Sequence, residues 1–341
     1  KLNVYYEFQP EMDRTRVAVY GTPGLELFAN LGDTPPRGLL DKGDYLYAVH
    51  RGTFYRINNA GVATSKGTLT TTTGIVSMEE NGSQIMITDD ANGYIYDIAR
   101  DSFFRLYKVR SSTTTSTVAN KLVDSGATFT TDGTVIGMTA YNTTDSTVAT
   151  ITAIDSNTTL SVSANNFPTA KVYEIGPDGF VVPSSVTYLD TYFIVTEVDT
   201  NKFQISDNDD GSAWDALDFA NAESHPDELV LATQNNGELV LFGTVSTEFW
   251  VNTGATDFPF SRVAINEWGL AAKWTVARFD NTLVYLARNL MGEVILVRLN
   301  GYIPQRISNF EWEFLINNYA DPTTATAFSY MLGGHQMYQI N

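Results

Sequence analysis

The chain has no cysteine among its 341 residues and only three histidines. Disulfides, thiolate metal sites and a cysteine nucleophile are therefore excluded. His50, His225 and His335 stand alone in the sequence, so no spacing supports a transition-metal site. The chain also lacks a Gly-x-Ser-x-Gly elbow and a phosphate-binding glycine loop ending in Lys-Ser or Lys-Thr. The commonest sequence signals of hydrolases and nucleotide enzymes are thus missing.

Basic residues are also scarce. There are 21 Lys and Arg against 39 Asp and Glu, a formal net charge of -18. Such a chain is repelled by phosphate, so we expect no direct nucleic-acid binding. No apolar run approaches a membrane span, and the start of the chain lacks the apolar core of a signal peptide, so we expect no membrane partner. Because the chain begins without Met and stops inside a predicted strand, we expect it to be a trimmed piece of a longer protein.

Short apolar and aromatic runs cut by Gly, Asn and Asp fill most of the sequence. Two consecutive copies of this pattern lie between residues 227 and 307. The runs of the first copy are 238–243, 246–252 and 258–263, and those of the second are 281–286, 292–297 and 302–307. The pattern is typical of antiparallel strands joined by tight turns. Each copy predicts one blade of a β-propeller.

Similar strand pairs occur earlier in the chain, at 45–50 with 52–57, 84–88 with 93–98, and 192–196 with 202–206. The equivalent apolar positions in these units are Leu46, Ile85, Phe193, Val240, Val284 and Met337. Successive positions are 39, 108, 47, 44 and 53 residues apart. If residues 111–176 are an insertion of 66 residues, the gap of 108 becomes 42. Every gap then lies near the roughly 40 to 50 residues of a four-stranded blade.

The sequence therefore predicts an all-β fold, a β-propeller of about six four-stranded blades. Closure of the ring requires one blade with strands from both termini. We expect the runs 16–21 and 24–29, separated by a Thr22-Pro23 turn, to complete the last unit around Met337. The alternative, a pair of β-sandwiches, would not produce a constant period.

The predicted division is 1–110 for the first part of the propeller, 111–176 for an inserted small β-module, and 177–341 for the second part, truncated at its C-terminus. The insertion opens with a Ser/Thr-rich run at 111–117, and its predicted strands are 134–141, 147–154 and 159–163. We expect few core contacts across its base, so a deletion joining Arg110 to Asp178 should leave the propeller folded.

The acidic stretch from Asp207 to Trp214 resembles the Asp-box turn of sialidase-like propellers, although Asp207 stands where a hydroxyl residue is usual. The first interpretation is a structural turn, with carboxylates capping backbone N–H groups and Trp214 packed in the blade. A calcium loop is the second, because closely spaced oxygens suit a hard cation. A sialidase would also need an arginine cluster and a tyrosine nucleophile, which the order of residues does not select. We assign no catalytic, cofactor-binding or metal residue.

A family resemblance is strongest after Leu217. The chain resembles the packaged-DNA stabilisation proteins of short-tailed phages, also called tail accessory factors or tail hub proteins. The resemblance covers about residues 16–110 and 177–320, and 111–176 fall outside it. The stretches that carry it are Tyr20 to Leu25, Leu217 to Asp227, Glu238 to Gly243, Ser246 to Trp250, Asn252 to Gly254, Gly269 to Ala272 and Gly301 to Ile307.

This resemblance implies a propeller and a structural virion protein of the phage tail, assembled in the host cytoplasm. The subunit would form a ring, hexameric in the family, below the portal and its adaptor. The ring would help to close the head, retain packaged DNA and attach the tail needle or tailspikes. The resemblance brings no enzymatic residue and no cofactor. Glu248, Phe249, Trp250 and Gly254 match its motif, and we expect them to serve in blade packing and turn formation.

Other function classes remain open at this point. A carbohydrate-binding or glycan-cleaving propeller would place aromatic side chains and carboxylates around its central pocket. An adhesive β-protein could share the same Thr-rich, acidic composition. If the chain does retain DNA, its charge of -18 requires that it act within a plug rather than grip the duplex. Screening by moderate salt should then favour assembly of the acidic subunits on the adaptor.

Overall fold

The computed structural model describes residues 4–9, 16–21, 24, 26–177, 179–223 and 225–341. Regular structure in these residues is almost entirely β, with one α-helix, α1 (Phe310–Asn317), and one 3-10 turn, η1 (Pro322–Thr324). Four antiparallel sheets have four strands each, paired in chain order. The first sheet contains β3 (Gly38–Lys42), β4 (Tyr45–His50), β5 (Thr53–Asn58) and β6 (Ala63–Thr68), and the second contains β7 (Ser77–Glu80), β8 (Gln84–Thr88), β9 (Gly93–Asp97) and β10 (Ser102–Arg105). The third sheet contains β17 (Pro183–Leu189), β18 (Tyr192–Glu197), β19 (Lys202–Asp207) and β20 (Asp210–Asn221). The fourth sheet contains β21 (Leu229–Asn235), β22 (Glu238–Gly243), β23 (Thr247–Asn252) and β24 (Phe260–Asn266).

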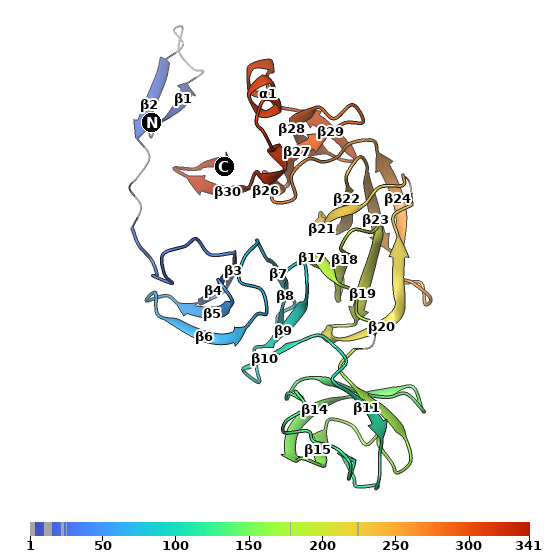
Figure 1. The fold of residues 1–341 in the computed structure, drawn as a ribbon. Helices are drawn as coiled ribbons and strands as arrows, with labels where there is room; N and C mark the ends of the chain where they lie inside the picture. Colours follow the sequence, from blue (N-terminus) through green and yellow to red (C-terminus); the bar gives the residue numbers. More distant parts are fainter. Residues whose placement is uncertain (1–3, 10–15, 22–23, 25, 178, 224) are drawn as a thin grey trace.

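Two further units follow in the chain. In the fifth sheet, β25 and β26 both pair with β27, and the order continues through β28 to β29. The sixth unit is the hairpin of β30 and β31. The bounds of these strands are β25 (Gly269–Leu270), β26 (Ala277–Phe279), β27 (Thr282–Arg288), β28 (Val294–Asn300), β29 (Ile303–Arg306), β30 (Ala327–Leu332) and β31 (His335–Ile340). Figure 1 shows the six units succeeding one another around a common centre. The predicted all-β propeller is confirmed, but its fifth sheet has five strands and its sixth unit has two.

The predicted closure of the ring is wrong for the described residues. β2 (Arg16–Gly21) pairs along its whole length with β1 (Val4–Gln9), from Val4 opposite Gly21 to Gln9 opposite Arg16. β30 and β31 pair only with each other, and residues 24 and 26–29 form no strand. A partner a few residues upstream closes a short loop, which costs less entropy than pairing with the far end of the chain. The predicted Thr22-Pro23 turn lies outside the described residues.

Tight turns set the register within the sheets. Between β21 and β22, Asn236 and Gly237 both have positive φ, 53° and 82°. These values fit a type I′ turn, whose twist matches that of the flanking strands. The turn places Asn235 opposite Glu238 and continues in register to Gln234 opposite Leu239. All three predicted runs of this sheet are found, as β22, β23 and β24.

Apolar side chains fill the spaces between neighbouring sheets. Aromatic rings meet edge to face across three of these interfaces, at Phe54 with Tyr96, Phe203 with Trp250, and Phe242 with Tyr285. The centroids of the last pair are 4.8 Å apart. Full burial of one such side chain contributes about 1.5–3 kcal/mol. Each interior sheet is therefore stabilised on both faces.

Residues 110–175 form a separate six-stranded sheet, drawn below the propeller in Figure 1. An isolated bridge connects Ser116, three residues after β11, with Val123 of the last strand and brings the two edges of the sheet together. Residues 134–138 of the first predicted strand are loop, and the Ser/Thr-rich run begins as a strand. In pairing order the strands are β11 (Arg110–Thr113), β16 (Val172–Ile175), β13 (Thr139–Asn142), β14 (Thr147–Ser156), β15 (Thr159–Val162) and β12 (Lys121–Val123).

The base of this β-module is not sparsely connected, contrary to our expectation. One buried cluster contains Tyr173 and Ile175 of the module together with Phe104 and Trp214 of the propeller. Hydrogen bonds also cross the base, from the Trp214 backbone N–H to the Tyr141 hydroxyl at 3.0 Å, for example. Deletion of the module would expose these apolar surfaces to water. Its removal without loss of stability is therefore no longer expected.

Candidate functional site

The innermost strands of the six units surround an axial cavity of about 460 Å³. Contacts between successive units run through these strands, from β3 to β7, β17 and β21 and from β26 to β30. Every unit therefore contributes to the wall of the cavity. One lining residue from each unit, in chain order, is Leu39, Glu79, Val186, Leu231, Val276 and Phe328.

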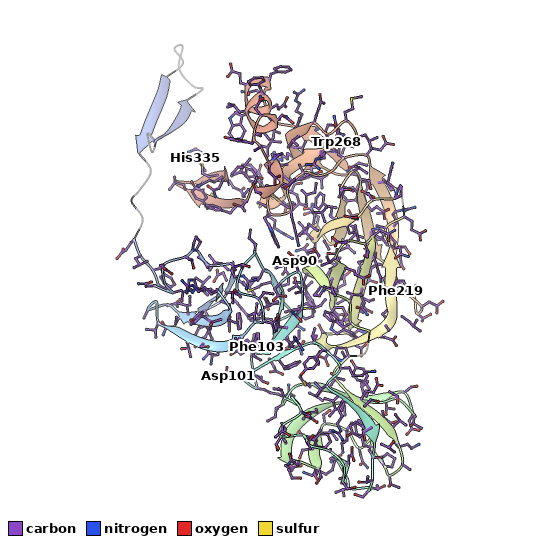
Figure 2. All side chains as sticks on the ribbon, in the orientation of Figure 1. Asp90, Asp101, Phe103, Phe219, Trp268 and His335 are labelled. Atoms are coloured by element: carbon purple, nitrogen blue, oxygen red, sulfur yellow. The ribbon has the colours of Figure 1, made fainter. Side chains whose placement is uncertain are left out.

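Lys273 tethers the fifth sheet to the second and third sheets at this cavity. Its ammonium group donates to the Asp90 carboxylate at 2.6 Å and to the Ser184 carbonyl and hydroxyl oxygens at 2.8 and 2.7 Å. Figure 2 labels Asp90 close to the centre of the ring of sheets. Burial lowers the pKa of Lys273, and the Asp90 charge opposes that shift. The side chain thus fastens three units together and has its hydrogen-bonding capacity used within the protein.

Arg37, the second cation that lines the cavity, is also committed to structure. Its guanidinium donates to the carbonyl oxygens of Gly74, Arg51, Thr71 and Thr73 at 2.6 to 2.9 Å, and to the Thr71 hydroxyl at 2.9 Å. These acceptors belong to the loops that flank the first sheet. Arg37 therefore orders this end of the propeller and is not free to bind an anionic ligand.

Glu79 on β7 is the acidic group of the cavity wall. Burial raises the pKa of its carboxyl group to about 7, Glu80 adds to the rise, and the charge of Arg278 and the backbone N–H of Glu80 oppose it. Within the described part of the chain, no side chain donates a hydrogen bond to Glu79, whereas Glu80 pairs with Lys42. Glu79 is thus a carboxyl group that titrates near neutral pH on a mostly apolar wall.

In the stretch from Asp207 to Trp214, Asn208 and Asp209 form the turn between β19 and β20, and the residues from Asp210 onward belong to β20. The Asp210 carboxylate accepts the Ser212 backbone N–H at 2.9 Å, and the Trp214 indole is buried, donating to the Gly211 carbonyl oxygen at 2.7 Å. These contacts agree with the structural-turn interpretation. Burial and the charges of Asp210 and Asp215 raise the pKa of Asp207. Among the described residues, no group of three or more His, Asp or Glu side chains is placed to hold a metal ion.

The three histidines belong to different parts of the fold. His50, on β4, lies 2.8 Å from the Thr34 hydroxyl through its Nε2 atom. His225 lies in the loop before β21, and His335 begins β31, as labelled in Figure 2. The structure does not bring them together into one site.

The motif that carries the family resemblance has a packing role in β23. The buried Glu248 carboxylate accepts hydrogen bonds from the Trp250 indole at 2.8 Å and from Arg262 at 3.0 Å. Phe249 is buried against Tyr302, and Gly254 adopts a φ of 67° in the following turn. The expected roles in blade packing and turn formation are confirmed.

A large exposed apolar surface surrounds α1, which we call the α1 surface. Phe310 is 82% exposed, Phe314 67% and Met291 89%. Together with Trp268 and Ile295 these side chains line a hollow of about 720 Å³. Contiguous exposed apolar side chains are typical of surfaces that contact another molecule. The further exposed members are Leu290, Ile303, Ile307, Trp312, Leu315 and Tyr319.

The helix α1 was not predicted from the sequence. Its sequence, Phe310-Glu-Trp-Glu-Phe-Leu-Ile-Asn, alternates apolar and acidic residues at the start, which is the pattern of a strand. The available helix signal was Asn309, whose side chain caps the Trp312 backbone N–H, with Glu311 and Glu313 in the first turn. Ion pairing of Glu313 with Arg306 then holds the helix on β29.

No helix in the described residues is long and apolar enough to cross a membrane.

The family model described as bacteriophage P22 Gp10, beta-propeller, matches residues 145–341, more than half of the chain. The chain belongs to this family. It is therefore a tail-associated structural protein of a phage. The match begins inside the β-module, in residues expected to fall outside the resemblance, and it does not include 16–110. No curated protein matches the chain.

Several solved structures are similar at low identity. They include dihydro-heme d1 dehydrogenase NirN, with a TM-score of 0.40, 8% identity and coverage of 90% of this chain and 51% of that one. Apo AztD from Citrobacter koseri has a TM-score of 0.36 and 8% identity, covering 89% and 77%. PorZ of Porphyromonas gingivalis has a TM-score of 0.32 and 11% identity, covering 80% and 32%. This chain thus spans about a third of PorZ and half of NirN, and similarities this weak do not indicate function.

Proposed function

We propose that the chain is a tail hub subunit that forms a ring below the portal adaptor, six-membered as in the family it resembles. The observation that carries this proposal is the α1 surface, where aromatic and aliphatic side chains are exposed together beside a wide hollow. Such a surface is suited to permanent contacts between virion proteins, whose interface cores are apolar. The portal adaptor, tail needle and tailspikes are the partners that the family resemblance suggests.

The chain would help to retain packaged DNA by assembling into the ring, and not by binding the DNA duplex directly. With a net charge of -18, the chain is repelled by phosphate. The ring would close the exit of the head as part of a plug made with other tail proteins. Assembly should strengthen with moderate salt, because screening reduces the repulsion between acidic subunits.

We propose no catalytic role, and the glycan-binding alternative gains little support. Trp274 lines the axial cavity, but the Lys273 ammonium lies 4.7 Å from the centre of its ring and occupies that aromatic face. Turnover of a glycan or peptide, abolished by substitution of one carboxylate, would contradict the proposal.

The decisive experiment compares phage particles made with and without this protein. We expect electron microscopy of labelled virions to place it between head and tail, and particles that lack it to lose DNA. A Phe310→Ser/Phe314→Ser double variant should reduce incorporation, whereas Leu217→Ser, at an exposed leucine on β20, serves as the matched control. Normal particles without the protein, or the same loss with Leu217→Ser, would contradict the proposed role of the α1 surface.

A further inference from the structure

The wall of the axial cavity combines aliphatic side chains with one carboxyl group. Aliphatic side chains from Leu39, Val186, Leu231 and Val276 form much of its wall, and Glu79 adds a carboxyl group. The charged side chains of the wall are Glu79, Arg37 and Lys273, and the cavity volume is about 460 Å³. A carboxyl group beside aliphatic side chains suits a small ligand that has a cationic head and a hydrocarbon stem.

Each other charged group that lines the cavity already has its partners. Lys273 is bonded to Asp90 and Ser184, and Arg37 is bonded to the surrounding loops. Glu80, next to Glu79, is paired with Lys42, and Arg278 donates to the Gln234 carbonyl oxygen at 3.2 Å. Glu79, in contrast, lines the cavity and accepts no hydrogen bond from a side chain within the residues that the structure describes.

We propose that the axial cavity binds an organic cation, an alkylammonium or alkylguanidinium group, through the Glu79 carboxylate. The cation could belong to a free amine or to a lysine or arginine side chain of another virion protein, and both present the same chemistry. A metal ion is not favoured, because a single carboxylate on aliphatic walls supplies too few oxygen ligands. This inference does not rest on the proposed ring or on DNA retention.

Binding should depend on pH in a definite direction. The Glu79 carboxyl group, with a pKa near 7, is mainly protonated at pH 6 and mainly ionised at pH 8. An alkylammonium ion stays charged throughout this range, so its affinity should rise about tenfold from pH 6 to pH 8. The other charged groups near Glu79 are Glu80 and Arg278, with Lys273 and Arg37 on the same cavity wall. Apart from Glu79, this set contains one acid, Glu80, and three bases, Arg278, Lys273 and Arg37.

The test is calorimetric titration of the full chain with n-butylammonium and n-propylguanidinium at pH 6 and pH 8. A short lysine-containing peptide with blocked ends forms a second arm, which separates a free amine from a protein side chain. We expect millimolar binding of the small cations at pH 8. Binding of the peptide as well would identify a partner side chain as the source, and its failure beside bound amines would identify a free ligand.

Glu79→Gln should abolish binding while it keeps the size and neutral form of the side chain. Glu311→Gln, at an exposed position on α1, is the matched control and should bind as the wild type does. NMR titration of the Glu79 carboxyl carbon gives a second readout, since a bound cation should lower its pKa. Absence of binding by the wild-type chain, or equal binding by Glu79→Gln, would overturn the inference and leave the tail hub proposal standing.

Discussion

The fourth sheet and the sixth unit use similar apolar strands and bury them very differently. In β22, Leu239 to Phe242 are fully buried between the third and fifth sheets. In β30, Phe328 is 48% exposed and Met331 67%. Within the described part of the chain, hydrogen bonds between the sixth unit and other sheets go to the fifth, as from the Tyr338 hydroxyl to the Thr275 carbonyl oxygen at 2.5 Å. An apolar strand sequence therefore provides a surface, and the neighbouring sheets determine how much of it is buried.

The largest expected effect tests this difference directly. Phe242→Ala should lower the free energy of unfolding by about 3–5 kcal/mol, because it opens a cavity between two sheets that cannot fully collapse. Phe328→Ala, at a half-exposed position in β30, should cost less than about 1 kcal/mol. Denaturant unfolding of both variants measures the two values. Equal losses would mean that the sixth unit is as well packed as the fourth.

A second comparison concerns Glu79, in the cavity that the sixth unit helps to enclose. Its carboxyl pKa rises from an ordinary 4.5 to about 7 on folding, so the folded chain holds this proton more tightly. The contribution of the Glu79 carboxyl group to the free energy of unfolding is therefore highest below pH 4.5, and it falls as the pH rises to about 7. Relative to Glu79→Gln, the wild type should lose about 2–3 kcal/mol across that window.

The measurement is the difference between wild-type and Glu79→Gln unfolding free energies at a series of pH values. Taking the difference removes the contributions of other carboxylates, such as Asp207. A difference that stays constant with pH would show that water fills the cavity freely and that the six units do not enclose Glu79.

The Lys273 tether should contribute less. Lys273→Met keeps most of the side-chain volume and removes the hydrogen bonds to Asp90 and Ser184. We expect a loss of about 1–2 kcal/mol. A double-mutant cycle with Asp90→Asn isolates the ion pair, which should account for less than about 1 kcal/mol because Asp90 is half exposed. Full additivity of the two substitutions would indicate no coupling between the second and fifth units.

The smallest effect on stability is expected at the α1 surface. Phe314 is mostly exposed, so Phe314→Ser should change the free energy of unfolding by less than about 0.5 kcal/mol. A large loss of stability would instead mean that α1 is part of the core of the fifth unit. Thermal unfolding of the purified variant separates this outcome from a defect in assembly.

The middle strands of the blades were predictable and the innermost strands were not. The predicted runs 238–243 and 281–286 are continuous apolar segments ended by turn residues, and they correspond to β22 and β27. The innermost strands have mixed sequences, as in Ser77-Met-Glu-Glu of β7, because they line a cavity. Since that cavity is made by six units far apart in the sequence, no local pattern marks its wall. Glu79 was missed for this reason.

What the sequence alone determined was the all-β class, the spacing of the repeated units, and the exclusion of cysteine chemistry. These properties follow from local patterns of apolar residues and turn residues within about 50 residues of chain. The tertiary structure alone decided the environment of each strand. It paired β2 with β1, joined the core of the β-module to Trp214, left Phe310 exposed and raised the pKa of Glu79. Burial depends on which distant segments lie on either side, and that information is not contained in any one stretch of the chain.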